Sequence, residues 1–195
     1  MEPSDVALLT SPAGRELVEA LPRYAAADAL TLGERLRASG HPPALVAAAL
    51  TQARLRTKAA ERWGASAEPL IRRLLLTPDG AEQATRPSVA ALRAARFARL
   101  GPGARIADLG CGVGLDLLAL AAAGLAVEGF ETDAVTATVA AANAAASLDA
   151  ARIRVQHTDV LHLPREHWAG YRALFADPAR RSAGRRLSRP EDWSP

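Results

Sequence analysis

The residues best suited to chemistry lie in one glycine-rich segment. A predicted strand, Arg105-Ile106-Ala107-Asp108, leads directly into Gly110, Gly112 and Gly114. Glycine lets the backbone turn sharply and lets a ligand approach without a Cβ in the way. The helix expected after the loop points its N-terminus at the same place. The segment therefore predicts a ligand-binding loop at the first crevice of an α/β sheet, although a tight turn without a ligand is the alternative.

Further candidate residues follow each of the next three predicted strands. They are Glu131 with Thr132 after the second strand, Asp159 with Val160 after the third, and Asp177 with Pro178 after the fourth. A carboxylate at the end of the second strand can accept both hydroxyls of a ribose, which suggests a nucleoside ligand for Glu131. The neighbouring Asp133 is a weaker candidate, because it could instead cap the helix that starts at residue 134.

The glycine spacing separates two classes of cofactor. The dinucleotide fingerprint needs glycines at positions one, three and six, and position six here is Leu115. The third glycine, Gly114, comes one position earlier, and Asp108 precedes the first glycine by two residues. A dinucleotide-dependent oxidoreductase is therefore the less favoured interpretation.

The run Asp108-x-Gly110-x-Gly112-x-Gly114 resembles motif I of the class I methyltransferases that use S-adenosyl-L-methionine (SAM). The resemblance implies that Asp108, Gly110, Cys111, Gly112 and Gly114 bind SAM or its product S-adenosylhomocysteine. It further implies that Glu131 and Thr132 bind the ribose, that Asp159 and the Val160 backbone bind the adenine, and that Asp177 and Pro178 lie beside the methyl group. A SAM-fold binding or partner module without transfer activity is the alternative.

Three other segments are similar to bacterial methyltransferases that carry a THUMP-like domain at the C-terminus. These segments are 76–85, 177–181 and 192–195. That family is distantly similar to trimethylguanosine synthase, which implies an RNA substrate and a base amino group as acceptor. The chain has Pro178-Ala179-Arg180 where the best-known amino methyltransferases have two prolines and an aromatic that stacks on the flipped base. The following arginines could hold a phosphate instead.

The spacing of apolar residues and of helix-capping residues predicts two domains. Helices are expected at about 14–21, 30–37, 44–63, 67–76 and 87–100, with a turn at 77–80. Strands are expected at 104–109, 126–130, 153–157 and 173–176, with helices at 115–124 and 134–146 between them. Alternating strands and helices predict a parallel sheet, so we expect residues 87–195 to form a Rossmann-like α/β domain. The helices expected before it predict a helical domain over residues 1–86. A methyltransferase sheet of this class has further strands, so we expect a sheet truncated after strand four, whose exposed edge favours self-association.

Composition and the absence of certain sequence signals bear on localisation, metal binding and cysteine chemistry. The formal net charge is +3, and Lys58 is the single lysine beside many arginines. The N-terminus lacks a secretory signal and no apolar run could span a bilayer, so we expect a cytoplasmic protein without membrane contact. No Cys/His spacing indicates a metal site. Cys111, the one cysteine, lies beside a helix N-terminus that could lower its pKa, but a packing role is favoured.

Overall fold

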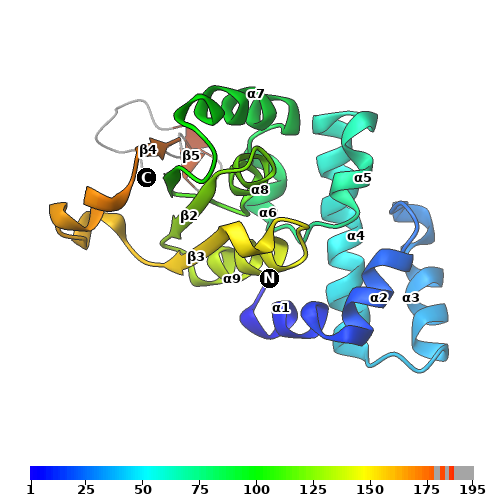
Figure 1. The fold of residues 1–195 in the computed structure, drawn as a ribbon. Helices are drawn as coiled ribbons and strands as arrows, with labels where there is room; N and C mark the ends of the chain where they lie inside the picture. The colour runs from blue at the N-terminus through cyan, green and yellow to red at the C-terminus, as the bar shows by residue number, and fades with distance from the viewer. Residues whose placement is uncertain (178–180, 183–184, 187–195) are drawn as a thin grey trace. The chain divides into compact units, whose positions relative to one another are not determined.

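The computed structural model describes residues 1–177, 181–182 and 185–186, and Figure 1 shows its elements in chain order. The chain divides into two compact units, Met1–Glu82 and Gln83–Pro195, called here the helical unit and the α/β unit. The division falls inside helix α6, four residues before the boundary predicted from the sequence.

The helical unit is built around one long helix. Its α-helices are α1 (Pro3–Thr10), α2 (Pro12–Ala20), α3 (Ala29–Ala38), α4 (Pro43–Trp63), α5 (Glu68–Ile71) and α6 (Pro78–Gln83), with short 3₁₀ turns η1 (Ala26–Asp28) and η2 (Ala65–Ala67). Helix α4 packs against α1, α2 and α3. Its inward residues, Val46, Ala49 and Ala53, are buried at helical spacing. Helix α1 was not among the helices predicted from the sequence.

Two local predictions in this unit were wrong. The helix expected over 67–76 ends at Ile71, and Leu74–Leu76 follow as a buried, non-helical segment. Gln52 of α4 donates to the Leu76 carbonyl and accepts from the Leu76 N–H, both at 2.9 Å, so side chains satisfy this backbone and it has no need of a helix. The turn expected at 77–80 is the start of α6, where Thr77 Oγ1 accepts from Gly80 N at 2.9 Å.

The α/β unit holds a parallel sheet. Its strands are β1 (Arg105–Leu109), β2 (Ala126–Glu131), β3 (Ile153–His157) and β4 (Ala173–Ala176), and its α-helices are α7 (Pro87–Phe97), α8 (Leu115–Ala122) and α9 (Ala134–Ala145). Short 3₁₀ turns are η3 (Ala98–Leu100), η4 (Ala150–Arg152), η5 (Val160–His162) and η6 (Arg165–Gly170), and a two-residue pair β5 (Arg181–Ser182) and β6 (Arg185–Arg186) follows. The four parallel strands run in the order β3-β2-β1-β4. The predicted α/β class with a helical N-terminal part is confirmed.

The two faces of the sheet differ in character. Ile106, Val127 and Ile153 share one face by register and form a core with Leu117 of α8 and Ala140 of α9. Because side chains alternate along a strand, the same register places Arg105, Glu128 and Arg154 on the opposite face.

The strand order also fixes where a ligand can enter. Strand β1 pairs with β2 on one side and with β4 on the other. The strand order therefore reverses at β1, because β2 and β3 lie on one side of it and β4 lies on the other. Ligands of open α/β sheets bind at the carboxyl ends of the strands at such a switch point. The glycine loop and Asp177 follow β1 and β4 directly, so both lie at this place. Among the described helices, none is long and apolar enough to cross a membrane.

Candidate functional site

The glycine loop turns tightly and is anchored to the end of β2. Gly110, Gly112 and Gly114 have φ values of +79°, +55° and +88°, in the left-handed region that glycine occupies without strain. The backbone N–H groups of Gly110 and Cys111 both donate to the Phe130 carbonyl, at 2.9 and 3.0 Å. A Cβ placed on Gly112 would meet nothing within 4 Å, so the space beside this residue is open to a ligand.

Glu131 is fixed in place by the same loop. Its Oε2 accepts from Gly112 N at 2.9 Å, and its Oε1 accepts from Asp133 N at 3.0 Å. The Thr132 hydroxyl also donates to Oε1, over a longer distance of 3.5 Å. An ionised carboxylate has about four acceptor positions, so Oε2 keeps capacity for one more donor, and a ligand hydroxyl could take the place of the exposed Thr132 hydroxyl on Oε1. The Glu131 side chain is thus oriented before any ligand arrives.

Asp108 is the most unusual residue of the site. The residue is 2% exposed, and its Oδ2 is buried with no hydrogen-bond partner among the described residues. Burial raises the pKa of Asp108 well above its usual range, and Asp116 raises it further, whereas Arg93 opposes the rise. A buried carboxylate oxygen without a partner is costly and needs an explanation; a ligand that donates to it is one.

Arg93 connects three parts of the site. Its Nη1 lies 2.7 Å from Oδ1 of Asp116 on α8, and its Nη2 lies 3.2 Å from Oδ2 of Asp177 after β4. Its guanidinium carbon lies 4.1 Å from the ring centroid of Phe175. Arg93 therefore ties α7 to the helix after the glycine loop and to the candidate acceptor residue.

Sequence reasoning missed Arg93 and Asp116. Arg93 is one of many arginines in the chain, and nothing in the pattern of α7 distinguishes it. Asp116 carried a usable signal, because it is an acid in the first turn of the helix that follows the loop, and only 7% of its surface is exposed.

Asp177 lies where the sequence predicted it, at the carboxyl end of β4. The pairing of Leu109 with Ala176 places it beside Gly110, and its side chain is 48% exposed. Pro178, its predicted catalytic neighbour, lies outside the described residues, as do Arg180 and Arg189. Arg181, Arg185 and Arg186 belong to β5 and β6.

The residues predicted to bind the adenine, and Thr132, which was predicted to bind the ribose, make contacts with their neighbours in the chain or in the sheet. Asp159 accepts from Leu161 N at 2.9 Å and lies 3.1 Å from His162 Nδ1, so it starts the turn η5, in which Val160 is half-buried. Thr132 is exposed, and its carbonyl contacts His157 Nε2 at 3.0 Å.

The sequence left two possible roles open for both Asp133 and Cys111, and the structure shows the contacts of each residue. Asp133 caps α9 by accepting from Thr136 N at 2.8 Å, as the capping interpretation expected. Cys111 is buried, and burial, followed by the nearby Asp108 carboxylate, raises the pKa of its thiol. The helix N-terminus therefore does not lower this pKa, because burial outweighs it. Cys111 packs against the Gly129 backbone in β2, in line with the favoured packing role. No cluster of three metal-ligating side chains occurs among the described residues.

Comparison with known proteins shows a similarity of fold. The solved structure of a "putative methyltransferase" from Porphyromonas gingivalis W83 is similar to this chain, with a TM-score of 0.59 at 17% sequence identity. The match covers 82% of this chain and 42% of that one, so this chain spans less than half of the length of that protein. Residues 2–59, in the helical unit, match the family model "Domain of unknown function (DUF8688)". A comparison with curated proteins found no match. The α/β unit thus has a methyltransferase-like fold.

Proposed function

We propose that the α/β unit binds SAM at the glycine loop and transfers its methyl group to RNA. The observation that carries the proposal is the Glu131 carboxylate, which the N–H groups of Gly112 and Asp133 hold at the end of β2. This geometry suits the two hydroxyls of a ribose, beside a loop whose open space at Gly112 admits the rest of a nucleoside. The methyltransferase-like fold supports the proposal at the level of fold alone.

The residues of the site fit SAM chemically. Glu131 would accept the ribose hydroxyls, with Thr132 beside it, and Asp159 with the Val160 N–H would meet the adenine. The unpartnered Oδ2 of Asp108 would accept from the cationic ammonium of the methionine part, directly or through water. When bound, SAM supplies an electrophilic methyl group on a sulfonium.

Asp177 is proposed to act on the acceptor side. Its carboxylate lies beside the loop and is held by Arg93 at 3.2 Å, so it is available to accept from an exocyclic amine. Such a hydrogen bond would orient the amine lone pair toward the methyl group without full deprotonation. Positioning of this kind supplies a large part of the acceleration in transfer reactions. The proposed RNA acceptor rests on the resemblance carried by residues 76–85 and 177–181.

Calorimetric titration with S-adenosylhomocysteine tests the cofactor site. We expect saturable binding by the wild-type chain and a loss of about tenfold or more in Glu131→Ala, because hydrogen bonds to a charged group contribute about 1.5–3 kcal/mol each. Glu166→Ala, an exposed acid in η6 of the same unit, is the matched control and should bind normally. Absence of binding by a folded wild-type chain, or an equal loss in the control, would refute the proposed site.

A transfer assay with radiolabelled SAM and RNA tests the reaction. We expect Asp177→Asn to lower the rate of transfer while S-adenosylhomocysteine affinity stays unchanged, because Asp177 faces the acceptor. If the wild type binds SAM but transfers to no RNA, the chain is a SAM-fold partner module. If it binds NADH in preference to SAM, the oxidoreductase interpretation replaces the proposal.

A further inference from the structure

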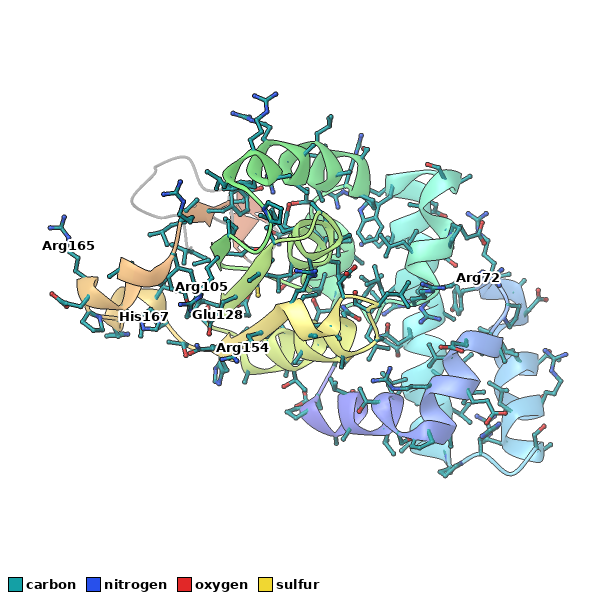
Figure 2. The ribbon with its side chains drawn as sticks, in the orientation of Figure 1. Arg72, Arg105, Glu128, Arg154, Arg165 and His167 are labelled. Carbon is teal, nitrogen blue, oxygen red and sulfur yellow. The ribbon has the colours of Figure 1, made fainter. Side chains whose placement is uncertain are left out.

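A second hollow lies at the other end of the sheet. It is a pocket of about 370 Å³, within the size range of small-ligand sites. Its lining comes from the amino ends of β1, β2 and β3 and from the segment before β4: Arg105, Ala126, Val127, Glu128, Ala151, Arg152, Arg154 and Tyr171. Figure 2 shows Arg105, Glu128 and Arg154 on neighbouring strands of this part of the sheet. Four residues of β1 separate Arg105 from Gly110 of the glycine loop, about 16 Å along the strand.

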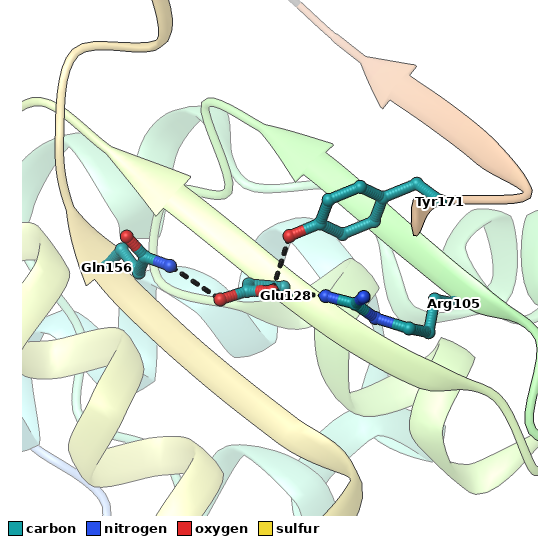
Figure 3. Close-up of polar contacts among 4 residues, drawn as sticks. All are labelled: Arg105, Glu128, Gln156 and Tyr171. Carbon is teal, nitrogen blue, oxygen red and sulfur yellow. Dashed lines mark hydrogen bonds and ion pairs between the residues drawn. The ribbon is translucent and has the colours of Figure 1, made fainter. Parts of the chain in front are cut away.

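The one carboxylate of this pocket is already engaged. Glu128 accepts hydrogen bonds from Tyr171 Oη, Gln156 Nε2 and Arg105 Nη2 (Figure 3). Burial opposes its ionisation, yet these three hydrogen bonds together hold the pKa of Glu128 below its usual range. Glu128 is therefore ionised at neutral pH and committed to its three neighbours, so it is not free to bind a cationic ligand.

Glu128 and Tyr171 together fix the position of Arg105. The Arg105 guanidinium lies 3.3 Å from the Glu128 carboxylate and its carbon lies 4.5 Å from the Tyr171 ring centroid. Burial and the bond to Glu128 raise the pKa of Tyr171 to about 12, so the phenol stays a donor. A guanidinium held on two sides loses less side-chain entropy when it binds an anion, and its remaining N–H groups stay available.

Two further arginines bring the pocket to an excess of positive charge. Arg152 is anchored through Nη1 to the Gly124 carbonyl at 3.2 Å, and its Nε lies 3.9 Å from Asp149. Arg154 stands opposite Glu128 in the β2–β3 register and is exposed. Three guanidinium groups thus line the hollow, and with Glu128 and Asp149 as the two acids that contact them this group of side chains has a net charge of +1. The arrangement suits a phosphate group.

We propose that this pocket binds a phosphate of an RNA strand and so anchors the RNA at the opposite edge of the sheet from the glycine loop. The assignment to RNA rests on the proposed function, whereas the affinity for phosphate rests on the arginines themselves. Arg105 supplies a fixed contact, and Arg152 and Arg154 close on the phosphate oxygens from β3 and the turn before it.

Fluorescence anisotropy of a short labelled oligouridylate tests the proposal. The double variant Arg152→Gln/Arg154→Gln should bind about tenfold more weakly than the wild type. Arg72→Gln/Arg165→Gln is the control, since it removes the same charge at two exposed positions outside the pocket (Figure 2). Between about 50 and 200 mM salt, the pocket variant should also lose about 0.7 from the slope of log affinity against log salt for each phosphate contact removed. Equal affinity in the two double variants would overturn the proposal.

A second arm separates the sources of the phosphate. Arginine Nε–H resonances in NMR spectra of the chain should move on addition of inorganic phosphate in the wild type and not in the pocket variant, and the oligouridylate should compete with that phosphate. If phosphate binds but the oligouridylate does not displace it, the pocket serves a free phosphorylated compound and the RNA assignment falls. Titration of the same samples with S-adenosylhomocysteine keeps the two proposals apart: RNA binding without S-adenosylhomocysteine binding refutes the methyltransferase proposal alone.

Discussion

Replacement of Arg93 by methionine tests whether the charges around the glycine loop depend on one cation. Methionine keeps the length of the apolar stem and removes the guanidinium. The side chains of Arg93 and Asp116 are only 20% and 10% exposed, so the pair is largely shielded from water. Removal of one partner of a buried pair costs about 3–5 kcal/mol, and partial exposure places Arg93 at the lower end. We expect Arg93→Met to lower the free energy of unfolding of the α/β unit by about 3 kcal/mol.

The same arginine offers an internal comparison. Asp177, its second partner, is 48% exposed, and exposed ion pairs contribute about 0–1 kcal/mol. Asp177→Asn should therefore cost less than about 1 kcal/mol. In the double variant Arg93→Met/Asp116→Asn no unpaired charge stays buried, so part of the loss should be recovered.

Urea denaturation followed by tryptophan fluorescence measures these differences. Trp63 lies in the helical unit and Trp168 in the α/β unit, so a Trp63→Phe/Trp193→Phe background leaves Trp168 to report on the α/β unit. The reasoning is refuted if Arg93→Met costs less than about 1 kcal/mol, or if Asp177→Asn costs as much as Arg93→Met.

Three other perturbations have defined outcomes. Folding raises the pKa of Asp108, so the folded state holds this proton more tightly than the unfolded state. The resulting stabilisation is complete below the unfolded pKa of about 3.9. It is lost as pH rises toward the folded pKa, by about 1.4 kcal/mol per pH unit. Asp108→Asn should match the wild type near pH 4 in urea denaturation and exceed it at pH 7, and equal stabilities at both pH values would contradict this. A Cβ on Gly129 would lie 2.6 Å from Leu117 Cδ1 and 2.8 Å from Cys111 Sγ, so Gly129→Ala should destabilise by about 1–3 kcal/mol, and an unchanged urea midpoint would disprove the close packing. Strand β4 ends the strand order of the parallel sheet, and we propose that it pairs with a second copy at high concentration; a monomer at every concentration by light scattering would rule this out.

The sequence predicted the α/β unit well because its signals are local. Each strand from β1 to β4 is a short segment with apolar residues whose two ends lie within one residue of the predicted bounds, and each helix between them follows a glycine or a capping acid. The Gly114 turn and the Asp133 cap mark where α8 and α9 begin. Residue type and spacing along the chain suffice for such features.

The failures share one physical cause, which is that distant residues decided the outcome. Leu74–Leu76 do not continue the helix before them, because the Gln52 amide bonds the Leu76 N–H and carbonyl and Arg56 Nε bonds the Leu74 carbonyl, both from far earlier in the chain. In the sequence nothing distinguishes Arg93 from an exposed arginine, because its partners Asp116 and Asp177 come close to its two nitrogens only in the folded chain. None of these partners is a near neighbour in sequence.

The two proposed sites divide the charge of the sheet between its edges. At the carboxyl edge, Asp116 and Asp177 both contact Arg93 and Glu131 is held at the glycine loop, so negative charge exceeds positive charge there. At the amino edge, Arg105, Arg152 and Arg154 surround a carboxylate that is already hydrogen-bonded. Under the proposed function, a sulfonium cofactor would be drawn to the first edge and a phosphate backbone would be repelled from it. An RNA acceptor would consequently need an anchor away from the glycine loop, so that a neutral base, and not the backbone, approaches Asp177.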